Sequence, residues 1–259
     1  MEYNLEAKIS LGQNFLKNKT IIKKIVEETR KYVDETTQIL EIGPGTGGLT
    51  QELLNIFPKN KVICVEADDR AIPILEERFA QNKKNFQIIH QDIRLFEPKG
   101  LKNYIIEANI PYYLTGFIFK KFLESNNQPK TMIFMVQKEI ADRSLDKKMS
   151  LFALGIKTYG TPYLFLKVSK GNFVPAPKVD SAVLVVKDIN KSIFIEEKKY
   201  KDLEKKYWEV AKKAFNSKRK QLGSTLKLTE EKYKKERPEN ITPEDWIYIT
   251  KLLYNNTNA

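Results

Sequence analysis

The residues best suited to chemistry in this sequence are the four at 109–112, Asn-Ile-Pro-Tyr. The side-chain oxygen of Asn109 and the backbone carbonyl of Ile110 can together accept both hydrogens of an exocyclic amine, which favours the pyramidal geometry that exposes the nitrogen lone pair. Pro111 fixes the turn and biases Ile110 away from helical angles, and Tyr112 offers a flat face on which a base can stack. The four residues predict methylation of a nucleobase amine by positioning and electrostatics, without a strong base. Taken alone, the motif also fits an ordinary turn after a strand.

A glycine-rich loop precedes this motif at 41–48, with the sequence Glu-Ile-Gly-Pro-Gly-Thr-Gly-Gly. Glycines such as Gly43 and Gly45 permit positive φ angles and a close approach of the backbone to a ligand. The helix expected to follow offers free N–H groups to an anionic group. Together with Gly48, the two glycines satisfy G-x-G-x-x-G, so a dinucleotide site is one interpretation. A tight turn without a ligand is the other.

Three polar side chains stand at the ends of successive predicted strands. Glu66 lies 23 residues beyond Gly43, where a carboxylate can accept hydrogen bonds from a ribose diol, a feature shared with NAD sites. Asp92 ends the next strand and can accept a hydrogen bond from an adenine amino group, and Asn109 ends the strand after that. Because the carboxyl ends of parallel strands meet along one crevice, we expect the three to converge. The set favours S-adenosylmethionine over NAD, although each carboxylate alone fits a solvated strand end.

Alternating strands and helices must position these side chains. Apolar runs predict strands at 38–42, 61–66, 86–90, 103–108 and 131–136, and helical spacing predicts helices at 18–33, 49–57, 69–80 and 115–125. This alternation implies crossover connections and a parallel sheet with helices on both faces. Two later segments, 162–168 and 181–186, can form an antiparallel hairpin at one edge. The expected fold class is therefore α/β, with a Rossmann-like, mostly parallel sheet.

A second, helical domain is expected after the sheet, because no strand pattern comparable to the first five recurs. We place a Rossmann-like methyltransferase domain at 1–187 and a small basic all-α domain at 188–259, with helices near 200–215, 217–226 and 243–253. The window 210–229 holds six basic side chains and no acidic one. Its candidate RNA-binding cations are Lys212, Lys213, Lys218, Arg219 and Lys220.

The overall charge also favours a polyanionic partner. The 259 residues include 45 Lys and Arg against 33 Asp and Glu, which gives a net charge of +12. Each phosphate that such a surface contacts releases condensed counterions, so nucleic acid is the favoured partner. A general lysine bias of the proteome is the alternative explanation.

Other classes of protein are excluded by composition. A single cysteine, Cys64, and a single histidine, His90, exclude a disulfide framework and sites rich in cysteine or histidine ligands. No apolar run approaches the ~18–20 residues of a transmembrane helix, and the first residues lack the features of a secretory signal. We therefore expect a cytoplasmic protein, a monomer, with no metal and no membrane partner.

Several motifs of the chain, in order, resemble those of the ribosomal RNA adenine N6-dimethyltransferases, the family that contains the KsgA/RsmA and Erm branches. The resemblance covers most of the chain, from Leu11 to about Leu226. Its motifs are Leu11 to Leu16 (LGQNFL), 41–50, Glu66, Asp92, 109–112, 134–139, Phe173 to Val183 (FVPAPKVDSAV) and 216–222 (NSKRKQL). Ile93 and Tyr113 depart mildly from the family pattern.

The resemblance implies a set of site residues. Contacts to S-adenosylmethionine are implied for Asn14, Leu16, Gly43, Glu66, Asp92 and Asn109, and we add Gly45 from the glycine loop. The motif 109–112 and Phe173 are implied to hold the target adenine, with Phe173 stacking on the ring face opposite Tyr112. A core aromatic is the alternative for Phe173.

The resemblance also implies a substrate. Leu11-Gly12 and the full Pro-Ala-Pro-Lys-Val-Asp-Ser-Ala-Val run are more similar to the KsgA/RsmA branch. That branch implies dimethylation of the N6 amino groups of two adjacent adenosines near the 3′ end of 16S (small-subunit) rRNA, in ribosome biogenesis. Two alternatives remain: an Erm-type 23S rRNA methyltransferase, and an RNA-binding ribosome-assembly factor with a vestigial site.

Overall fold

The computed structural model describes residues 5–8, 12–109, 111–194 and 202–257. The chain divides into two compact units, one made of residues 1–141 and 163–189 and the other of 142–162 and 190–259. The expected domain boundary at 187/188 lies next to this division. Residues 142–162, which we expected in the first domain, instead belong to the second unit.

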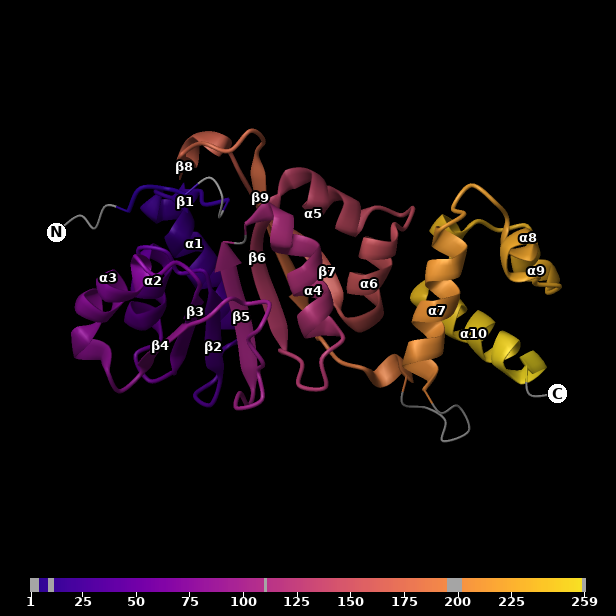
Figure 1. Cartoon of the computed structure of the whole chain (residues 1–259), viewed down its shortest axis with the longest axis horizontal. Helices are drawn as coiled ribbons and strands as arrows, with labels where there is room; N and C mark the ends of the chain where they lie inside the picture. The colour runs from indigo at the N-terminus through magenta and orange to yellow at the C-terminus, as the bar shows by residue number, and fades with distance from the viewer. Residues whose placement is uncertain (1–4, 9–11, 110, 195–201, 258–259) are drawn as a thin grey trace. The chain divides into compact units, whose positions relative to one another are not determined.

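A seven-stranded sheet forms the centre of the first unit (Figure 1). Its strands stand in the order β4-β3-β2-β5-β6-β9-β7. Their bounds are β2 Gln38–Ile42, β3 Val62–Glu66, β4 Phe86–His90, β5 Tyr104–Asn109, β6 Thr131–Gln137, β7 Thr161–Val168 and β9 Ser181–Lys187. Strands β2 to β6 pair in parallel, and β9 runs antiparallel to β6. The expected Rossmann-like α/β fold, mostly parallel with an antiparallel edge, is confirmed.

Helices cover both faces of this sheet. The helices of the first unit are α1 Lys19–Thr29, α2 Gly48–Ile56, α3 Ala71–Arg78 and α4 Thr115–Leu123. One buried cluster joins α1, α2 and α3 to strand residues such as Ile39 and Val62. On β6, Ile133 packs with α1, whereas the neighbouring Phe134 contacts Phe119 of α4 at 5.0 Å between ring centroids. Because successive strand residues point to opposite faces, α4 covers the face that α1 does not.

Strand order places a crevice at the centre of the sheet. The chain runs outward from β2 through β3 to β4, and then returns to the other side of β2 as β5. Open parallel sheets bind ligands at such a switch point, at the carboxyl ends of the strands. A separate two-stranded sheet pairs β1 (Phe15–Leu16) with β8 (Phe173–Val174).

The second unit is helical. It contains α6 Leu151–Tyr159, α7 Leu203–Phe215, α8 Leu222–Leu226, α9 Glu231–Lys234 and α10 Pro243–Thr257, while α5 Lys138–Leu145 spans the division. Hydrogen bonds tie α6 to α7: the Thr158 and Tyr207 hydroxyls lie 2.7 Å apart, and the indole N–H of Trp208 donates to the Tyr159 hydroxyl at 2.8 Å. These contacts explain why 142–162 joins the helical unit. The sequence analysis predicted neither α5 nor α6.

Short 3-10 turns connect several elements, at Arg30–Tyr32, Ala80–Asn82, Tyr112–Leu114, Lys170–Asn172, Ser192–Phe194 and Pro238–Asn240. Within the described ranges, every helix is too short or too polar to cross a membrane. The same residues contain no cluster of three or more histidine, cysteine, aspartate or glutamate side chains arranged to hold a metal ion.

Candidate active site

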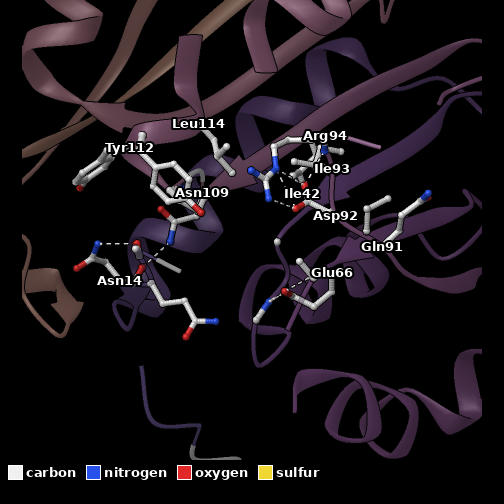
Figure 2. Close-up of a pocket in the computed structure, with 18 of the residues that line it drawn as sticks. Asn14, Ile42, Glu66, Gln91, Asp92, Ile93, Arg94, Asn109, Tyr112 and Leu114 are labelled. Carbon is white, nitrogen blue, oxygen red and sulfur yellow. Dashed lines mark hydrogen bonds and ion pairs between the residues drawn. The ribbon is translucent and has the colours of Figure 1, made fainter. Parts of the chain in front are cut away.

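A pocket opens at the carboxyl ends of β2, β3, β4 and β5, where the strand order predicts a ligand site. Its volume is about 880 Å³ when the space open to solvent is counted. Figure 2 shows Asn14, Asn109 and Tyr112 on one side of it and Glu66, Asp92 and Arg94 on the other. The full lining is Gly12 to Phe15, Ile42, Gly43, Gly45, Val65 to Ala67, Gln91 to Arg94, Asn109 and Pro111 to Leu114. The three strand-end side chains therefore converge as expected.

The glycine loop is held to the end of β3 by Glu66. The Glu66 carboxylate accepts hydrogen bonds from the backbone N–H groups of Gly45 (3.0 Å), Ala67 (2.8 Å) and Asp68 (2.8 Å). Burial raises the pKa of this carboxyl, while the three N–H groups oppose the shift. A carboxylate has about four acceptor positions, so Glu66 retains capacity for a ribose hydroxyl at the pocket surface.

Glycine is required at two positions of the loop for different structural reasons. Gly45 has φ +57°, and a Cβ there would lie 2.7 Å from the Phe15 ring, so only glycine allows this approach of β1. Gly43 has φ +68°, and a Cβ there would meet nothing within 4 Å. Gly43 therefore faces open space in the pocket.

Asp92 lies in the pocket but is already ion-paired. The Arg94 guanidinium donates to both carboxylate oxygens of Asp92, with Nε 3.0 Å from each. This cation holds the pKa of Asp92 below its usual range. Both oxygens of Asp92 are therefore engaged by Arg94, a partner that the sequence analysis missed. The sequence does contain an Asp-x-Arg pair after a strand. In the structure the backbone N–H of Arg94 donates to the Asp92 carboxylate at 2.8 Å.

Asn109 is oriented by the segment around Asn14. Its side-chain N–H donates to the backbone carbonyl of Asn14 at 2.8 Å. With the amide nitrogen used in this way, the side-chain oxygen accepts no hydrogen bond from any residue that the structure describes. The oxygen is thus left as a free acceptor on a residue that lines the pocket. The backbone carbonyl of Asn14 therefore orients the side-chain amide of Asn109.

Tyr112 is fixed at its far end. Its hydroxyl lies 2.7 Å from the hydroxyl of Ser181, the first residue of β9, and burial raises the pKa of the phenol. Pro111 has φ −54° and ψ 126°, and its carbonyl accepts the Leu114 N–H at 2.9 Å, which closes the turn. The expected role of the Ile110 carbonyl lies outside the described residues. Ser181 was not singled out from the sequence.

Leu16 and Phe173 are placed differently from the expectation. They pair across the β1–β8 sheet, and Phe15 rather than Leu16 lines the pocket. Leu16 lines a neighbouring cavity instead. Phe173 is 3% exposed and packs in the core with Ile25 and Met135. Its ring does not line the pocket, and in this structure it occupies a core position.

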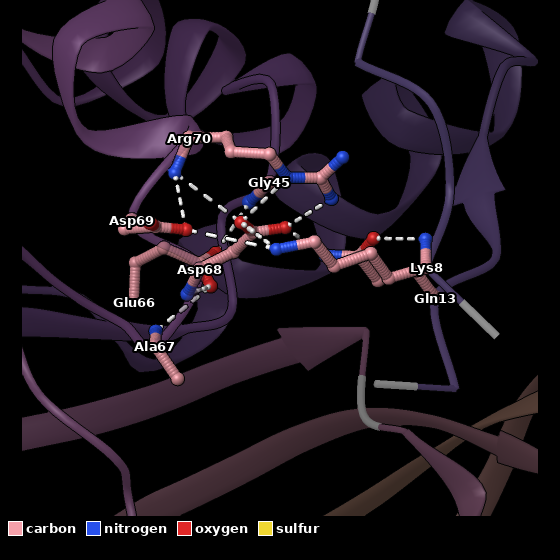
Figure 3. A network of polar contacts seen from close by, with 8 residues as sticks. All are labelled: Lys8, Gln13, Gly45, Glu66, Ala67, Asp68, Asp69 and Arg70. Carbon is pink, nitrogen blue, oxygen red and sulfur yellow. Dashed lines mark hydrogen bonds and ion pairs between the residues drawn. The ribbon is translucent and has the colours of Figure 1, made fainter. Parts of the chain in front are cut away.

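A network of polar contacts connects the amino-terminal segment to the loop after β3 (Figure 3). The fully buried Asp68 carboxylate accepts from the Gln13 amide at 2.8 Å and from two guanidinium nitrogens of Arg70. The Gln13 oxygen in turn accepts the Lys8 N–H at 2.8 Å. Arg70 holds the pKa of Asp68 well below its usual range. The network therefore anchors one wall of the pocket beside Glu66, and neither Gln13 nor Asp68 was assigned from the sequence alone.

Two buried carboxyl groups lie behind the pocket. Glu41 of β2 is in register with Glu107 of β5, and both line a small cavity that shares Gly43 and Asn109 with the main pocket. Burial raises the pKa of Glu41 to about 7 and that of Glu107 to about 8. Glu107 accepts a hydrogen bond from the Thr29 hydroxyl, while its second oxygen is buried without a partner. Burial therefore favours the protonated form of both carboxyl groups.

The predicted RNA-binding cations lie in the second unit, around the end of α7. Their side chains are all exposed, and none makes an ion pair with another residue in the described part of the chain: Lys212, Lys213, Lys218, Arg219 and Lys220. Ser217 and Lys220 continue the chain in turns after α7. The segment is thus available to a polyanion.

This chain is similar to proteins that act on ribosomal RNA. The family model described as "Ribosomal RNA adenine dimethylase" matches residues 4–252. A ribosomal RNA small subunit methyltransferase A from a Hydrogenobaculum species is 34% identical over 251 residues, 96% of this chain and 94% of that protein. The protein of the same name from Dehalococcoides mccartyi is 38% identical over 190 residues. That match takes in 71% of this chain and 64% of the relative, so it spans less than two thirds of the relative's length.

Two solved structures share the fold. A dimethyladenosine transferase from Plasmodium falciparum superposes with a TM-score of 0.78 at 23% identity, over 93% of this chain and 97% of that one. The 23S rRNA methyltransferase ErmE gives a TM-score of 0.74 at 22% identity, over 93% and 100% of the two chains. At these identities the likeness concerns architecture.

Proposed function

Because the chain belongs to the ribosomal RNA adenine dimethylase family, we propose that it dimethylates the N6 amino groups of two adjacent adenosines near the 3′ end of 16S rRNA. The methyl donor in this proposal is S-adenosylmethionine, and the reaction belongs to ribosome biogenesis. The protein acts as a monomer in the cytoplasm, on the small subunit or its precursor.

The observation that carries the proposal is the oriented amide of Asn109. Its nitrogen is committed to the Asn14 carbonyl at 2.8 Å, so its oxygen remains as an acceptor in the same pocket as Glu66 and Asp92. An amine that is to be methylated needs an acceptor for its hydrogens, and a donor nucleoside needs acceptors for its ribose and adenine. This pocket supplies both kinds of acceptor from separate strand ends.

The residues present fit the donor. Glu66 has acceptor capacity left for the ribose hydroxyls, and Asp92 shares its oxygens between Arg94 and the donor adenine. Gly43 leaves the pocket open for the donor, because any side chain at this position would point into that space. Asn14 lines the wall of the pocket that the Gln13–Asp68 hydrogen bond anchors. When bound, S-adenosylmethionine supplies an activated methyl group on a sulfonium.

The chain's own residues then position the target base. The oxygen of Asn109 accepts one amino hydrogen, and the carbonyl of Ile110 accepts the other. Tyr112 presents a ring held in place by Ser181. Alkylation makes the amine proton acidic, so the proton leaves to solvent without a dedicated base. Electrostatic positioning of this kind can account for the chemistry.

The basic segment of the second unit supports an RNA substrate. Its exposed cations have no ion-pair partners within the described ranges, as expected of side chains reserved for phosphates. We propose residues 188–259 as the RNA-binding domain, and residues 1–141 and 163–187 as the methyltransferase domain. The names of the relatives favour the small subunit over the large one.

Methyl transfer followed by base mapping tests the proposal. Purified protein and labelled S-adenosylmethionine are incubated with unmethylated small subunits and, separately, with naked 23S rRNA. We expect label on two adjacent adenosines near the 3′ end of 16S rRNA. Label only on 23S rRNA would replace the proposal with the Erm-type activity. Donor binding by calorimetry without transfer to either RNA would indicate an assembly factor with a vestigial site.

A further inference from the structure

A third hollow of the first unit shares Phe15 of β1 with the donor pocket. It is a surface groove with a volume of about 1860 Å³ when the space open to solvent is counted, lined by residues of β1, α1, the glycine loop, α2 and β8. Four cations line it, Lys17, Lys19, Lys23 and Arg78, and we call it the basic groove. Phe15 lines both the basic groove and the donor pocket, so the two hollows share a wall.

The lysine side chains of the basic groove do not contribute polar contacts to the fold. Lys17, Lys19 and Lys23 are exposed, and none forms an ion pair or side-chain hydrogen bond within the part of the chain that the structure describes. At the other end of α1 the cations are paired: Arg30 with Glu27 at 2.8 Å and Lys31 with Glu28 at 2.7 Å. The cations that directly follow α1 are therefore neutralised, whereas those at its amino-terminal end are left free.

Helix stability does not explain this placement. The first turn of α1 contains no acidic residue, and cations near a helix amino terminus oppose the helix dipole. The acid that lines the groove, Glu52, faces four cations there. Arg78 is already positioned, because its guanidinium donates to the Thr46 carbonyl at 2.6 Å. The excess of positive charge is therefore a property of the groove surface, suited to a polyanion.

We propose that the basic groove binds the phosphate backbone of the RNA strand that flanks the target adenosine. The inference rests on the proposed function, since it takes the substrate of the donor pocket to be RNA. Continuity supports it: the wall shared through Phe15 puts the groove directly beside the pocket, and Val174 of β8 extends the same wall. Lys19 and Lys23 are four positions apart on α1, about 6 Å along its axis and on one helix face. Their charges can thus follow successive phosphates of one strand.

The test compares two triple variants with equal changes of charge. The groove variant carries Lys17→Gln, Lys19→Gln and Lys23→Gln. The matched control carries Lys83→Gln, Lys84→Gln and Lys99→Gln, at exposed lysines of the same unit that do not line the basic groove. The affinity of each protein for the RNA that wild type methylates is measured from about 50 to about 200 mM salt. Donor affinity and the rate at saturating RNA are measured in parallel.

We expect the groove variant to bind RNA more weakly and with a flatter salt dependence. Three lost contacts to single-stranded phosphates lower the slope of log affinity against log salt by about 2. Over that fourfold range of salt, the affinity of the groove variant then falls about 20-fold less than that of wild type. Donor affinity and the saturated rate stay within twofold of wild type, and the control triple keeps the wild-type slope.

Equal salt slopes for the two triple variants would overturn the proposal, because any effect would then come from net charge alone. Weaker binding of the groove variant to vesicles of anionic lipid, with RNA binding unchanged, would also overturn it in favour of a membrane surface. The readout uses whichever RNA wild type methylates, so a 23S product would contradict the proposed function while leaving the groove test intact. Conversely, correct 16S methylation with equal slopes would contradict the groove alone.

Discussion

Replacing Glu107 by glutamine should change how the stability of the protein depends on pH. Glu107 is fully buried in β5, beside Glu41 in register on β2, and one of its oxygens has no hydrogen-bond partner. Burial raises the pKa of its carboxyl from 4.5 to about 8. Glutamine has the same shape and no charge, so it mimics the protonated acid and can still accept from Thr29.

The direction of the pH dependence follows from the pKa of Glu107 in the folded and the unfolded chain. Above about pH 4.5 the unfolded chain releases this proton, whereas the folded chain keeps it until about pH 8. The free energy of unfolding therefore falls as the pH rises between those values and levels off above them. At about 1.36 kcal/mol for each pKa unit, Glu107 costs the protein about 2.5 kcal/mol between about pH 5 and pH 7. In the variant Glu107→Gln, this contribution to the slope of the free energy of unfolding against pH is absent.

Urea unfolding at a series of pH values measures the effect. Relative to wild type, we expect Glu107→Gln to gain about 2.5 kcal/mol of stability between about pH 5 and pH 7. The control is Glu76→Gln, at an exposed position on α3, and its profile should parallel that of wild type. If the Glu107→Gln profile also runs parallel to wild type, the acid is ionised in the folded protein and the reasoning from burial is wrong.

Three further predictions concern the proposed site and its RNA surface. Glu66→Ala should weaken S-adenosylmethionine binding by roughly 10–150-fold, from the loss of hydrogen bonds to a charged group worth ~1.5–3 kcal/mol; an unchanged dissociation constant by calorimetry would remove Glu66 from the donor site. Asn109→Ala should slow single-turnover methyl transfer by roughly 10²–10³, by analogy with an oxyanion-hole donor, and a wild-type rate at saturating donor and RNA would contradict the mechanism. Reversing Lys218, Arg219 and Lys220 to glutamate should weaken RNA binding and flatten its salt dependence. If donor affinity fell instead, those cations would not be an RNA surface.

Local pattern was sufficient to predict most of the sheet. The strands at 38–42 and 86–90 have the predicted bounds, because each is a short apolar run with clear breaks on both sides. Helix α1 begins after Asn18, whose side chain accepts hydrogen bonds from the N–H groups of Thr20 and Ile21. Helices α5 and α6 were missed because what holds α6 is distant in sequence: Tyr159 and Trp208 meet across 49 positions. A pattern within a short stretch of sequence cannot predict a contact between residues so far apart.

The site was predictable where strand ends define it. Parallel strands bring Glu66, Asp92 and Asn109 to one edge whatever the details of packing, and the structure places them there. Side-chain direction in β1 and β8 was not predictable, since a strand of two residues has no periodicity to read. Phe15 rather than Leu16 lines the pocket for that reason. The ion pair of Asp92 with Arg94 depends on a guanidinium position that sequence spacing alone does not fix.

The β1–β8 sheet also sets an order of events during synthesis. Leu16 pairs with Phe173, a residue made 157 positions later. At ~5–20 residues per second, the ribosome needs roughly 8–30 s to cover that interval. During that interval the strand that carries Phe15 has no β-partner, while β2 to β6 are made one after another and can pair with each other. A growing chain can therefore complete the parallel part of its sheet before β1, which walls its pocket, gains its partner β8.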